Sequence, residues 1–453
     1  MRGFSHVTVL GAGISGLSAA WKLQERGIQT LVLEARPQVG GLAKTVHWND
    51  FRFDVGPGHF FTRERLLLDE MKSLMGGPFQ TRLRQHRVRM EGKWIPFPLT
   101  TRTLLRVPFS TLRGAVQEFV EVQAKALWQT PEEAPAIPSS SSPLSNPLLE
   151  RLARRDLLEQ TWKQSAAFFR PNWSTPDQPG VTQEKIQRNL LAQLFQPPQA
   201  STSTFHYPGA GMGSIAQQMK DRIEHLGGQV LTEARVKRIL LDKGEVEAVH
   251  YSKQGDCLQH TDYVISTIPL QTLTTLLDPL PQHALIETSA RLRYNSLLFL
   301  CLEMERSEVD TSCWYDFLDV PFFRASYALP VRPQQARRNR RSCLVVEWQV
   351  SGDSPLARAS AEELLEICLP ELEKAELTQR SEIRNIQLHR EVYGAPIQGA
   401  HSQQHLRRLQ GFLTGVRRLR SIGWQGKFES CRLSQAIRSG LETARILTDE
   451  TPT

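Results

Sequence analysis

The segment Val7-Thr-Val-Leu-Gly11-Ala-Gly13-Ile-Ser-Gly16 sets the fold that we expect for this chain. Its apolar start predicts a strand, its glycines predict a tight turn, and the residues after Gly13 predict a helix that ends at Gly27. Gly11 permits the turn, Gly13 lets the backbone approach a pyrophosphate, and Gly16 lets the helix lie close to the strand. The free N–H groups at the helix N-terminus then face the phosphates. This segment therefore predicts a dinucleotide-binding unit.

A second predicted strand, Leu31-Val-Leu-Glu34, ends in a carboxylate and is followed by the pair Gly40-Gly41. Glu34 stands 18 residues after Gly16, where an acidic side chain accepts hydrogen bonds from a ribose hydroxyl. A carboxylate there repels a 2′-phosphate, so an NADP-like nucleotide is excluded. The alternative, a glycine-rich turn in an unrelated α/β unit, explains neither the acidic residue nor its spacing.

The composition is that of an ordinary globular protein with room for two or three domains. The 453 residues are 40% hydrophobic and 23% charged, and the apolar runs are too short to cross a bilayer. The N-terminus leads directly into the first strand without a signal peptide, so we expect a cytoplasmic protein. The net charge is +8, but no aromatic residues alternate with the arginines, so we expect no nucleic-acid partner.

The cysteines predict neither a metal site nor a disulfide framework, because no C-x-x-C spacing or nearby histidine pair accompanies them. We expect reduced thiols and no bound metal. The six residues are Cys257, Cys301, Cys313, Cys343, Cys368 and Cys431.

Elements typical of the nucleotide-binding unit return far along the chain, which indicates a discontinuous domain. A third glycine turn, 207–214, precedes a predicted helix from Ile215 to about Leu226, with Ser214 as its N-cap. Further elements of this domain are strands over 230–241, 246–252, 263–269 and 419–422 and a closing helix over 434–444.

The segments between these elements are predicted to form an inserted substrate domain of mixed α+β type. It holds a hairpin over 87–99 that turns at Glu91-Gly92, and strands over 297–304 and 343–350. A Pro- and Ser-rich run, 129–146, is predicted to be a flexible loop because it buries too little apolar surface to become ordered. The fold expected is thus α/β, with a Rossmann-type nucleotide domain of 1–62, 203–275 and 385–453 and a substrate domain of 63–202 and 276–384.

These motifs, in this order, resemble the flavin-containing amine oxidase and protoporphyrinogen oxidase superfamily, whose relatives include UDP-galactopyranose mutases and carotenoid desaturases. The resemblance implies FAD as the cofactor. It covers the chain from residue 7 to residue 444, in the glycine motifs quoted above and in Phe53-Asp54-x-Gly56, Tyr207-Pro-Gly-Ala-Gly211-Met-Gly213-Ser214, Val264-Ile-Ser-Thr-Ile-Pro269, Ala395-Pro396, Ile422-Gly423-x-x-Gly426-x-Phe428 and Gln435-Ala-Ile-x-Ser-Gly440.

The resemblance also implies which residues hold the FAD. Arg36, Gly40 and Gly41 would lie along the pyrophosphate and ribityl chain, and Val236 beside the adenine. The closing helix would aim its N-terminus at the pyrimidine edge of the flavin, a role that also follows from the helix dipole. The complete predicted set is Gly11, Gly13, Ile14, Ser15, Gly16, Glu34, Ala35, Arg36, Gly40, Gly41, Leu42, Gly56, Val236, Gly423, Leu433 and Ser434.

The chain departs from the superfamily pattern close to the expected flavin. The family histidine aligns with Gly58, so that His59 falls one position later, and we take His59 as the candidate catalytic residue without assigning a general base. The arginine that commonly follows the C-terminal glycine is Trp424 here, and the family Met-Asp is Leu433-Ser434. The candidate walls of the substrate site are Phe60, Phe61, Trp94, Phe97, Tyr207, Trp314 and Tyr393.

The function expected is an FAD-dependent two-electron oxidation of a small or hydrophobic organic substrate at flavin N5. A first alternative is a non-redox sugar-nucleotide isomerase of the UDP-galactopyranose mutase type, with Arg324, Arg291 or Arg293 clamping a diphosphate. A second alternative is a flavin-binding protein without turnover. The expected partner is a small-molecule substrate, and the oligomeric state stays open.

A segment from Trp94 to Leu112 places apolar residues among Arg102 and Arg106, with Arg113 next to it. Such a pattern suits peripheral docking on an anionic membrane surface. The competing interpretation is a helix of the substrate domain that packs on its own core, since apolar stripes usually face inward.

Overall fold

We describe the fold from a computed structural model of the chain. The predicted residues His59 and Phe61, the loop 129–146 and positions 98–112 of the basic and apolar segment lie outside the described residues. The structure describes residues 4–56, 60, 62, 64–77, 79–83, 85–90, 92–97, 204–306, 309–311, 313–317, 320–397, 400–429 and 431–449.

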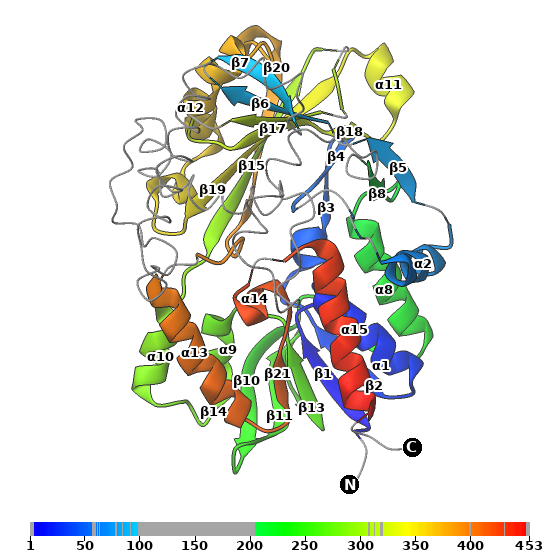
Figure 1. The fold of residues 1–453 in the computed structure, drawn as a ribbon, viewed down its shortest axis with the longest axis vertical. Helices are drawn as coiled ribbons and strands as arrows, with labels where there is room; N and C mark the ends of the chain where they lie inside the picture. Colours follow the sequence, from blue (N-terminus) through cyan, green and yellow to red (C-terminus); the bar gives the residue numbers. More distant parts are fainter. Residues whose placement is uncertain are drawn as a thin grey trace, which may run out of the picture.

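The lower layer of the molecule in Figure 1 is built on a parallel sheet whose strands come from distant parts of the sequence. Apolar residues with extended-chain propensity fill its central strand, where Val7, Val9 and Leu10 are buried. Neighbouring strands all pair in parallel, so their carboxyl ends meet at one edge. The order is β21 (Leu419–Ser421), β13 (Tyr263–Ser266), β1 (His6–Leu10), β2 (Gln29–Leu33) and β9 (Gln229–Leu231).

Helices pack side by side on one face of this parallel sheet (Figure 1). The closest pair consists of α1 (Ile14–Glu25) and α15 (Leu433–Asp449), which cross at Gly440. A Cβ at Gly440 would lie 2.3 Å from the carbonyl oxygen of Ser15, so only glycine lets the two backbones approach this closely. Next to them lie α8 (Gly213–His225) and α2 (Arg65–Leu74).

The other face of the parallel sheet is covered by a smaller sheet and two helices. Leu10 and Leu33 of the parallel sheet share one apolar cluster with Ile239, Val249 and Leu409 of these covering elements. The smaller sheet has the order β12 (Asp256–His260), β11 (Glu245–Ser252), β10 (Arg235–Asp242) and β14 (Leu277–Asp278), and the helices are α9 (Leu270–Leu276) and α13 (Ala400–Gly415), with α10 (His283–Ala290) against both.

The upper layer is a seven-stranded sheet, with the apolar face of α12 (Ala361–Lys374) on one side (Figure 1). Ser360 caps this helix in a capping box with Glu363, which satisfies the first free N–H groups. The strand order is β20 (Ile383–Glu391), β15 (Asn295–Met304), β19 (Ser342–Ser351), β17 (Arg324–Tyr327), β16 (Cys313–Phe317), β6 (Gln85–Met90) and β7 (Lys93–Phe97).

Small sheets connect the two layers (Figure 1). Phe51 and Phe53 pack against Phe299 and Cys301 on the face of the seven-stranded sheet opposite α12. The connecting strands are β3 (Thr45–Trp48), β4 (Phe51–Asp54) and β18 (Leu329–Pro330) in one sheet, and β5 (Gln80–Leu83) and β8 (Thr204–Tyr207) in another, with α11 (Pro333–Arg338) next to β18.

Most predicted elements are confirmed, including the hairpin of β6 and β7, the strands β15 and β19 and the closing helix. Two details are wrong. The predicted strand 230–241 is two strands in different sheets, because the chain turns at Glu233 with φ +57°. Ser214 is not an N-cap: α8 begins at Gly213, and the Ser214 hydroxyl donates to the carbonyl of Gly211 at 2.6 Å.

Two of the predicted domain boundaries do not coincide with the change between the layers. Residue 385 falls inside β20, which pairs with β15 of the seven-stranded sheet, so the change of layer comes after Glu391. Residues 276–290 belong to the lower layer, since β14 pairs with β10 and α10 packs on α9 and α13. The short apolar strand of β14 carries too little pattern to be recognised in the sequence.

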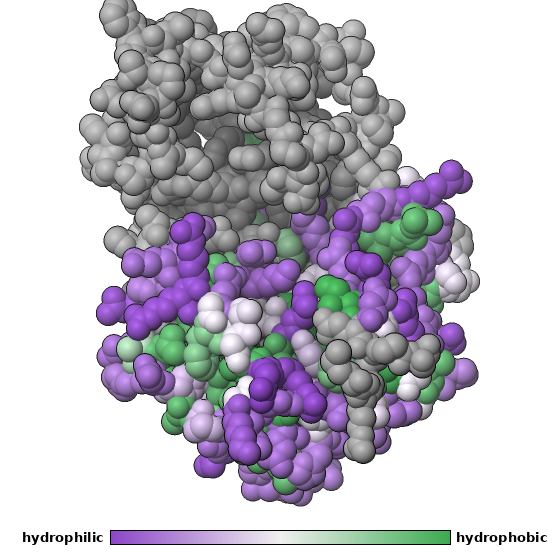
Figure 2. Space-filling model, turned by 60° about the horizontal axis from the view of Figure 1, so that its bottom comes forward, coloured by the Kyte–Doolittle hydropathy of each residue, from purple (hydrophilic) through white to green (hydrophobic). Residues whose placement is uncertain are grey.

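The lower layer is mainly polar on the surface that Figure 2 shows. On the face shown in Figure 2, hydrophilic residues predominate and hydrophobic residues form smaller groups between them. Among the described residues, no helix is long and apolar enough to span a bilayer. At the start of the segment considered for membrane docking, Trp94 packs edge-to-face on Tyr315 and Phe317, at 5.2 and 5.3 Å between ring centroids, and is partly buried against the apolar cluster of the seven-stranded sheet.

We expect Gly440→Ala to lower the free energy of unfolding by about 1–3 kcal/mol, because its methyl group would force α15 away from Ser15. The matched control is Gly411→Ala in α13, where a Cβ would meet no atom within 4 Å. That change should raise the stability by about 0.5–1 kcal/mol through helix propensity. Urea unfolding followed by circular dichroism measures both, and equal effects would contradict the close crossing.

Candidate functional site

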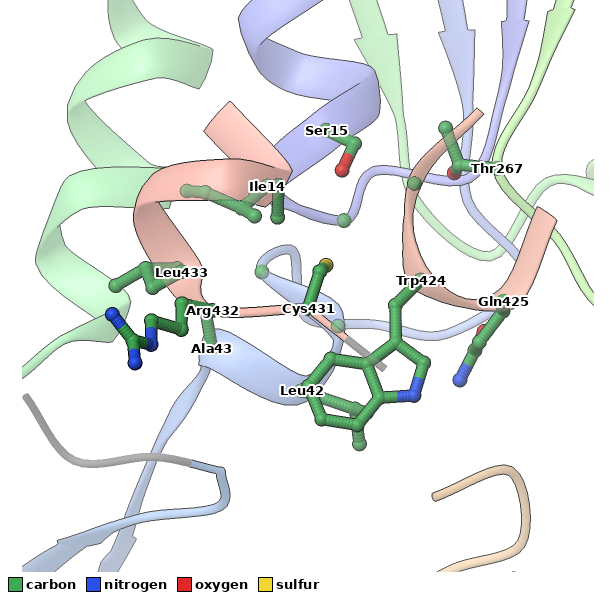
Figure 3. A pocket seen from close by; sticks show the side chains of 15 residues that line it. Ile14, Ser15, Leu42, Ala43, Thr267, Trp424, Gln425, Cys431, Arg432 and Leu433 are labelled. Atoms are coloured by element: carbon green, nitrogen blue, oxygen red, sulfur yellow. The ribbon is translucent and has the colours of Figure 1, made fainter. Parts of the chain in front are cut away.

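A pocket opens where the carboxyl edge of the parallel sheet meets the N-termini of α1 and α15. Figure 3 shows Ile14 and Ser15 on one side and Leu42 on the other, with Trp424 beside Leu42. Neither helix has an acidic residue in its first turn. The pocket is lined by Gly13, Ile14, Ser15, Gly40, Gly41, Leu42, Ala43, Thr267, Gly423, Trp424, Gln425, Cys431, Arg432, Leu433 and Ala436.

The glycine turn and the second glycine pair lie backbone to backbone at the floor of this pocket. Gly40 donates its N–H to the carbonyl of Ala12 at 2.7 Å, and a Cβ at Gly41 would lie 3.3 Å from the Cα of Gly13. A Cβ at Gly13 itself would meet no protein atom within 4 Å. A side chain at Gly13 would therefore occupy pocket space, which is the arrangement needed for a phosphate to approach the backbone.

The turn is held from the side by Glu34. Its carboxylate accepts the N–H of Ala12 at 2.9 Å and the N–H of Arg36 at 3.0 Å. The backbone also joins this position to the chain after β9, since Ala234 donates to the carbonyl of Glu34 at 2.8 Å. Glu34 thus orients the glycine turn, and Val236 lies two residues after Ala234, in β10.

The structure brings together half of the predicted cofactor residues around the pocket. Gly11 and Gly16 lie below it in the turn, and Gly56 approaches the Leu42 carbonyl so closely that a Cβ would lie 2.3 Å away. Glu34, Ala35, Arg36, Val236 and Ser434 are not in the lining. The lining residues that sequence reasoning missed are Ala43, Thr267, Trp424, Gln425, Cys431, Arg432 and Ala436. These residues could have been found in the sequence only because they lie next to motif residues, since their residue types do not indicate a cofactor site.

An ionic network centred on the buried Glu391 joins the pocket region to the seven-stranded sheet. Glu391, at the end of β20, pairs with Lys44 and with the Arg36 guanidinium, whose Nη1 lies 2.7 Å from its Oε2. His389 Nε2 lies 2.6 Å from Oε1 of the same carboxylate. Burial raises the pKa of Glu391, but the contacts with His389, Lys44 and Arg36 outweigh it, so the pKa is lowered. The Arg36 side chain is therefore engaged in this network.

Asp54 organises the loop that precedes α8. Its carboxylate accepts the Thr45 hydroxyl at 2.5 Å, the Tyr207 hydroxyl at 2.9 Å and the Met212 N–H at 3.0 Å. Burial raises its pKa, and the same hydrogen bonds oppose that rise. Gly211, at φ +99°, would place a Cβ 2.4 Å from Thr45 Oγ1. The Phe-Asp motif and the third glycine turn thus form one structural unit beside the pocket.

A charged row lies on the face of the seven-stranded sheet that carries Phe299 and faces β4. Asp316, Arg324 and Glu347 are direct cross-strand neighbours on β16, β17 and β19. Arg324 Nε donates to Asp316 Oδ1 at 2.7 Å, and its guanidinium lies over the Trp314 ring. Burial raises the pKa of the Glu347 carboxyl to about 7, with Arg324 opposing and Asp316 adding to the rise.

The other residues predicted to line the substrate site lie in different parts of the fold. Phe60 is buried and stacks on Phe79 at 5.7 Å, while Trp314 stacks on Phe205 at 6.0 Å. Tyr393 contacts Tyr294 next to α14 (Gly423–Lys427). Of the arginines, Arg293 is exposed and pairs with Asp353 at 2.6 Å.

The six cysteines, all described, are free, as predicted. Among the described residues no cluster of histidine, cysteine and acidic side chains suits a metal ion. Cys431 lines the pocket, and burial raises the pKa of its thiol to about 12, so it is neutral there.

Comparison with known proteins identifies the family. The sequence model for flavin containing amine oxidoreductases matches residues 14–448. The chain belongs to this family. Flavin-containing amine oxidase A of Sus scrofa is 27% identical over 285 residues, which cover 59% of the chain and 50% of the relative. Amine oxidase B of Mus musculus is also 27% identical, over 58% of the chain and 50% of the relative. The chain thus spans about half the length of these curated relatives.

Solved structures share the fold of this family member. A reduced UDP-galactopyranose mutase superposes with a TM-score of 0.71 at 19% identity, over 98% of the chain and 94% of that protein. A putrescine oxidase with bound putrescine reaches a TM-score of 0.56 at 16% identity, over 98% and 99%. The resemblance to the amine oxidase superfamily is confirmed, and the family implies a flavin cofactor.

The residues present fit an FAD. Gly13 leaves open space in front of the α1 N-terminus, where phosphate oxygens find free N–H donors. Glu34 stands beside the same turn as a carboxylate for a ribose hydroxyl. Leu433 lines the pocket at the N-terminus of α15.

We expect Glu391→Gln to lower the free energy of unfolding by about 3–5 kcal/mol. The change leaves Lys44 buried without its counter-charge. Glu366→Gln is the control, because that exposed carboxylate pairs with Arg380 in solvent, and its loss should change stability little. Urea unfolding at neutral pH compares the two, and similar effects would show that the Glu391 network does not hold the layers together.

Glu347 should make stability depend on pH. Its pKa is raised on folding, so its contribution is complete below the ordinary glutamate pKa and is lost as pH rises through about 7. We expect Glu347→Gln to gain stability relative to the parent between pH 5 and pH 8, by about 1–3 kcal/mol. Urea unfolding across this range measures the difference, with the exposed Glu247→Gln as control. A constant difference would refute the raised pKa.

Proposed function

We propose that the chain is an FAD-dependent oxidase of amine oxidase type, which removes two electrons from a small or hydrophobic organic substrate. The observation that carries the proposal is the open space in front of Gly13 at the N-terminus of α1, with Glu34 beside the turn. The family match over residues 14–448 supports the same reading. The flavin of a bound FAD supplies the two-electron acceptor.

We propose that one domain holds the cofactor, with residues 1–62, 203–275 and 385–453 as its core and the boundaries shifted as described above. The strands β1, β13 and β21 from these three ranges lie in one parallel sheet, which supports a Rossmann-type arrangement. Ile14 and Ser15 would bind phosphate through backbone N–H groups, and the Glu34 carboxylate would accept a ribose hydroxyl. Leu433 would direct the α15 N-terminus at the flavin, where it favours negative charge.

The substrate would lie between this pocket and the face of the seven-stranded sheet that bears the charged row. Trp314, which stacks on Phe205, would supply apolar surface there, and Glu347 would supply a carboxyl whose pKa near 7 allows it to hold or accept a proton. His59 stays a candidate from the sequence. We expect substrates whose polar group tolerates a neighbouring carboxyl, amines being the first to test.

The charges around two of the three candidate arginines disfavour the mutase alternative. A diphosphate clamp needs guanidinium groups that are free to bind phosphate, but Arg324 is held by Asp316 and flanked by Glu347. Arg293 lies on the surface paired with Asp353. The high TM-score with UDP-galactopyranose mutase concerns the fold, at 19% identity.

The decisive experiment is the absorption spectrum of the purified protein, followed anaerobically with candidate amines, porphyrinogens, polyenes and UDP-sugars. Bleaching of the flavin band by an amine supports the proposal. Turnover of a UDP-sugar only after prior reduction supports the mutase. A flavin that no candidate reduces supports binding without turnover.

We expect Gly13→Val to abolish FAD binding while the protein stays folded, because the side chain would fill only the space in front of α1. The loss of affinity should exceed about a hundredfold, which corresponds to roughly 3 kcal/mol. Gly77→Val is the control, since its Cβ also meets nothing within 4 Å but lies in another loop. Reconstitution of the apoprotein with FAD, followed by fluorescence, measures both.

Unchanged FAD affinity in Gly13→Val would remove the main support of the proposal. Glu34→Gln is the less clean test, because Glu34 also accepts the N–H groups of Ala12 and Arg36, so its change would disturb the turn as well.

A further inference from the structure

Trp424 lines the pocket and carries a buried polar atom without a hydrogen-bond partner among the described residues. Its side chain lines the pocket beside Leu42 (Figure 3). Its indole Nε1–H is buried and has no acceptor among the described residues. A buried donor without an acceptor costs about 1–3 kcal/mol, so such groups normally have a partner.

The position of Trp424 is fixed by its neighbours. Gln425 donates through Nε2 to the carbonyl of Tyr393 at 2.6 Å and accepts the Tyr294 hydroxyl on its own carbonyl at 2.8 Å. Gly423, at φ +77°, lies so close to Ser15 that a Cβ would be 2.7 Å from its hydroxyl oxygen. Because α14 is held on both sides, the indole cannot move far from the pocket.

A missing acceptor alone does not indicate a ligand. Trp348 also has a buried Nε1–H without an acceptor among the described residues, but it lies inside the apolar cluster between the seven-stranded sheet and α12. Trp424 differs because it borders the pocket. Its superfamily counterpart, an arginine, is a donor as well, so the position keeps a hydrogen-bond donor although the residue has changed.

The surroundings indicate which part of the cofactor Trp424 meets. Gly13 and Ser15 of the α1 N-terminus mark the phosphate end of the pocket. Leu42 leads through Lys44 into β3, and Tyr393 follows β20. Both therefore connect the side of the pocket that holds Trp424 to the upper layer of the molecule. Trp424 therefore stands on the flavin side of the phosphate site.

We propose that Trp424 is a cofactor-contact residue that donates its indole N–H to an oxygen of the ribityl–flavin half of FAD. This inference rests on the proposed function. The indole is a neutral donor in place of the charged guanidinium of the superfamily arginine. Its flat apolar ring would stack on or beside the ribityl–flavin half of the FAD. The contact gives this chain its own means of holding the flavin where the superfamily arginine is absent.

The test compares Trp424→Phe with Trp348→Phe. Both remove one unpaired indole N–H and keep an aromatic ring, but only Trp424 borders the pocket. We expect the FAD dissociation constant of the Trp424→Phe apoprotein to rise about three- to tenfold, as for the loss of one hydrogen bond. ADP, which lacks the ribityl–flavin half, should compete as well as with the parent. Trp424→His, which restores a ring N–H donor, should recover part of the affinity and serves if the Phe variant is unstable.

Each outcome decides the inference. Equal FAD affinities in Trp424→Phe, Trp348→Phe and the parent would overturn it. Equal losses of FAD and ADP affinity in Trp424→Phe would also overturn it, because the acceptor would then lie in the ADP half. Failure of the parent protein to bind FAD would instead refute the proposed function, so the two failures are distinguishable.

Discussion

The pocket depends on the approach of backbone segments at positions without side chains. Gly13 and Gly41 touch at its floor, Gly423 touches Ser15, and Gly440 touches the Ser15 carbonyl from α15. These contacts converge on the first turn of α1. A Cβ at Gly41, Gly423 or Gly440 would come too close to α1 or its N-cap. These glycines therefore let three segments surround the α1 N-terminus while the space in front of Gly13 stays open.

Charge then joins this region to the layer above it. The buried pairing of Glu391 with Lys44 links the start of β3 to the end of β20. A second polar unit around Asp54 ties β3 and β4 to the loop before α8. Both units use fully engaged carboxylates, which is how a buried charge is tolerated. The two layers are thus connected by specific polar contacts as well as by apolar packing.

The charged row on the seven-stranded sheet differs from these two units in the protonation of one of its carboxyl groups. Asp316 and Arg324 are joined by a hydrogen bond, whereas Glu347 lies beside Arg324 as its cross-strand neighbour. Burial keeps its pKa near 7, so its protonation changes under physiological conditions. This group lies on the face of the seven-stranded sheet that packs on β4.

The sequence by itself determined the nucleotide-binding turn, the carboxylate of Glu34, the discontinuous return of strands β13 and β21 and the superfamily, because local spacing and glycine conformations encode them. It did not determine which side chains meet on the seven-stranded sheet. Asp316, Arg324 and Glu347 come from three strands, and only strand register places them in one row. The network of Glu391 with Lys44 and the orphaned indole of Trp424 likewise depend on tertiary contacts between distant segments, for which no local pattern exists.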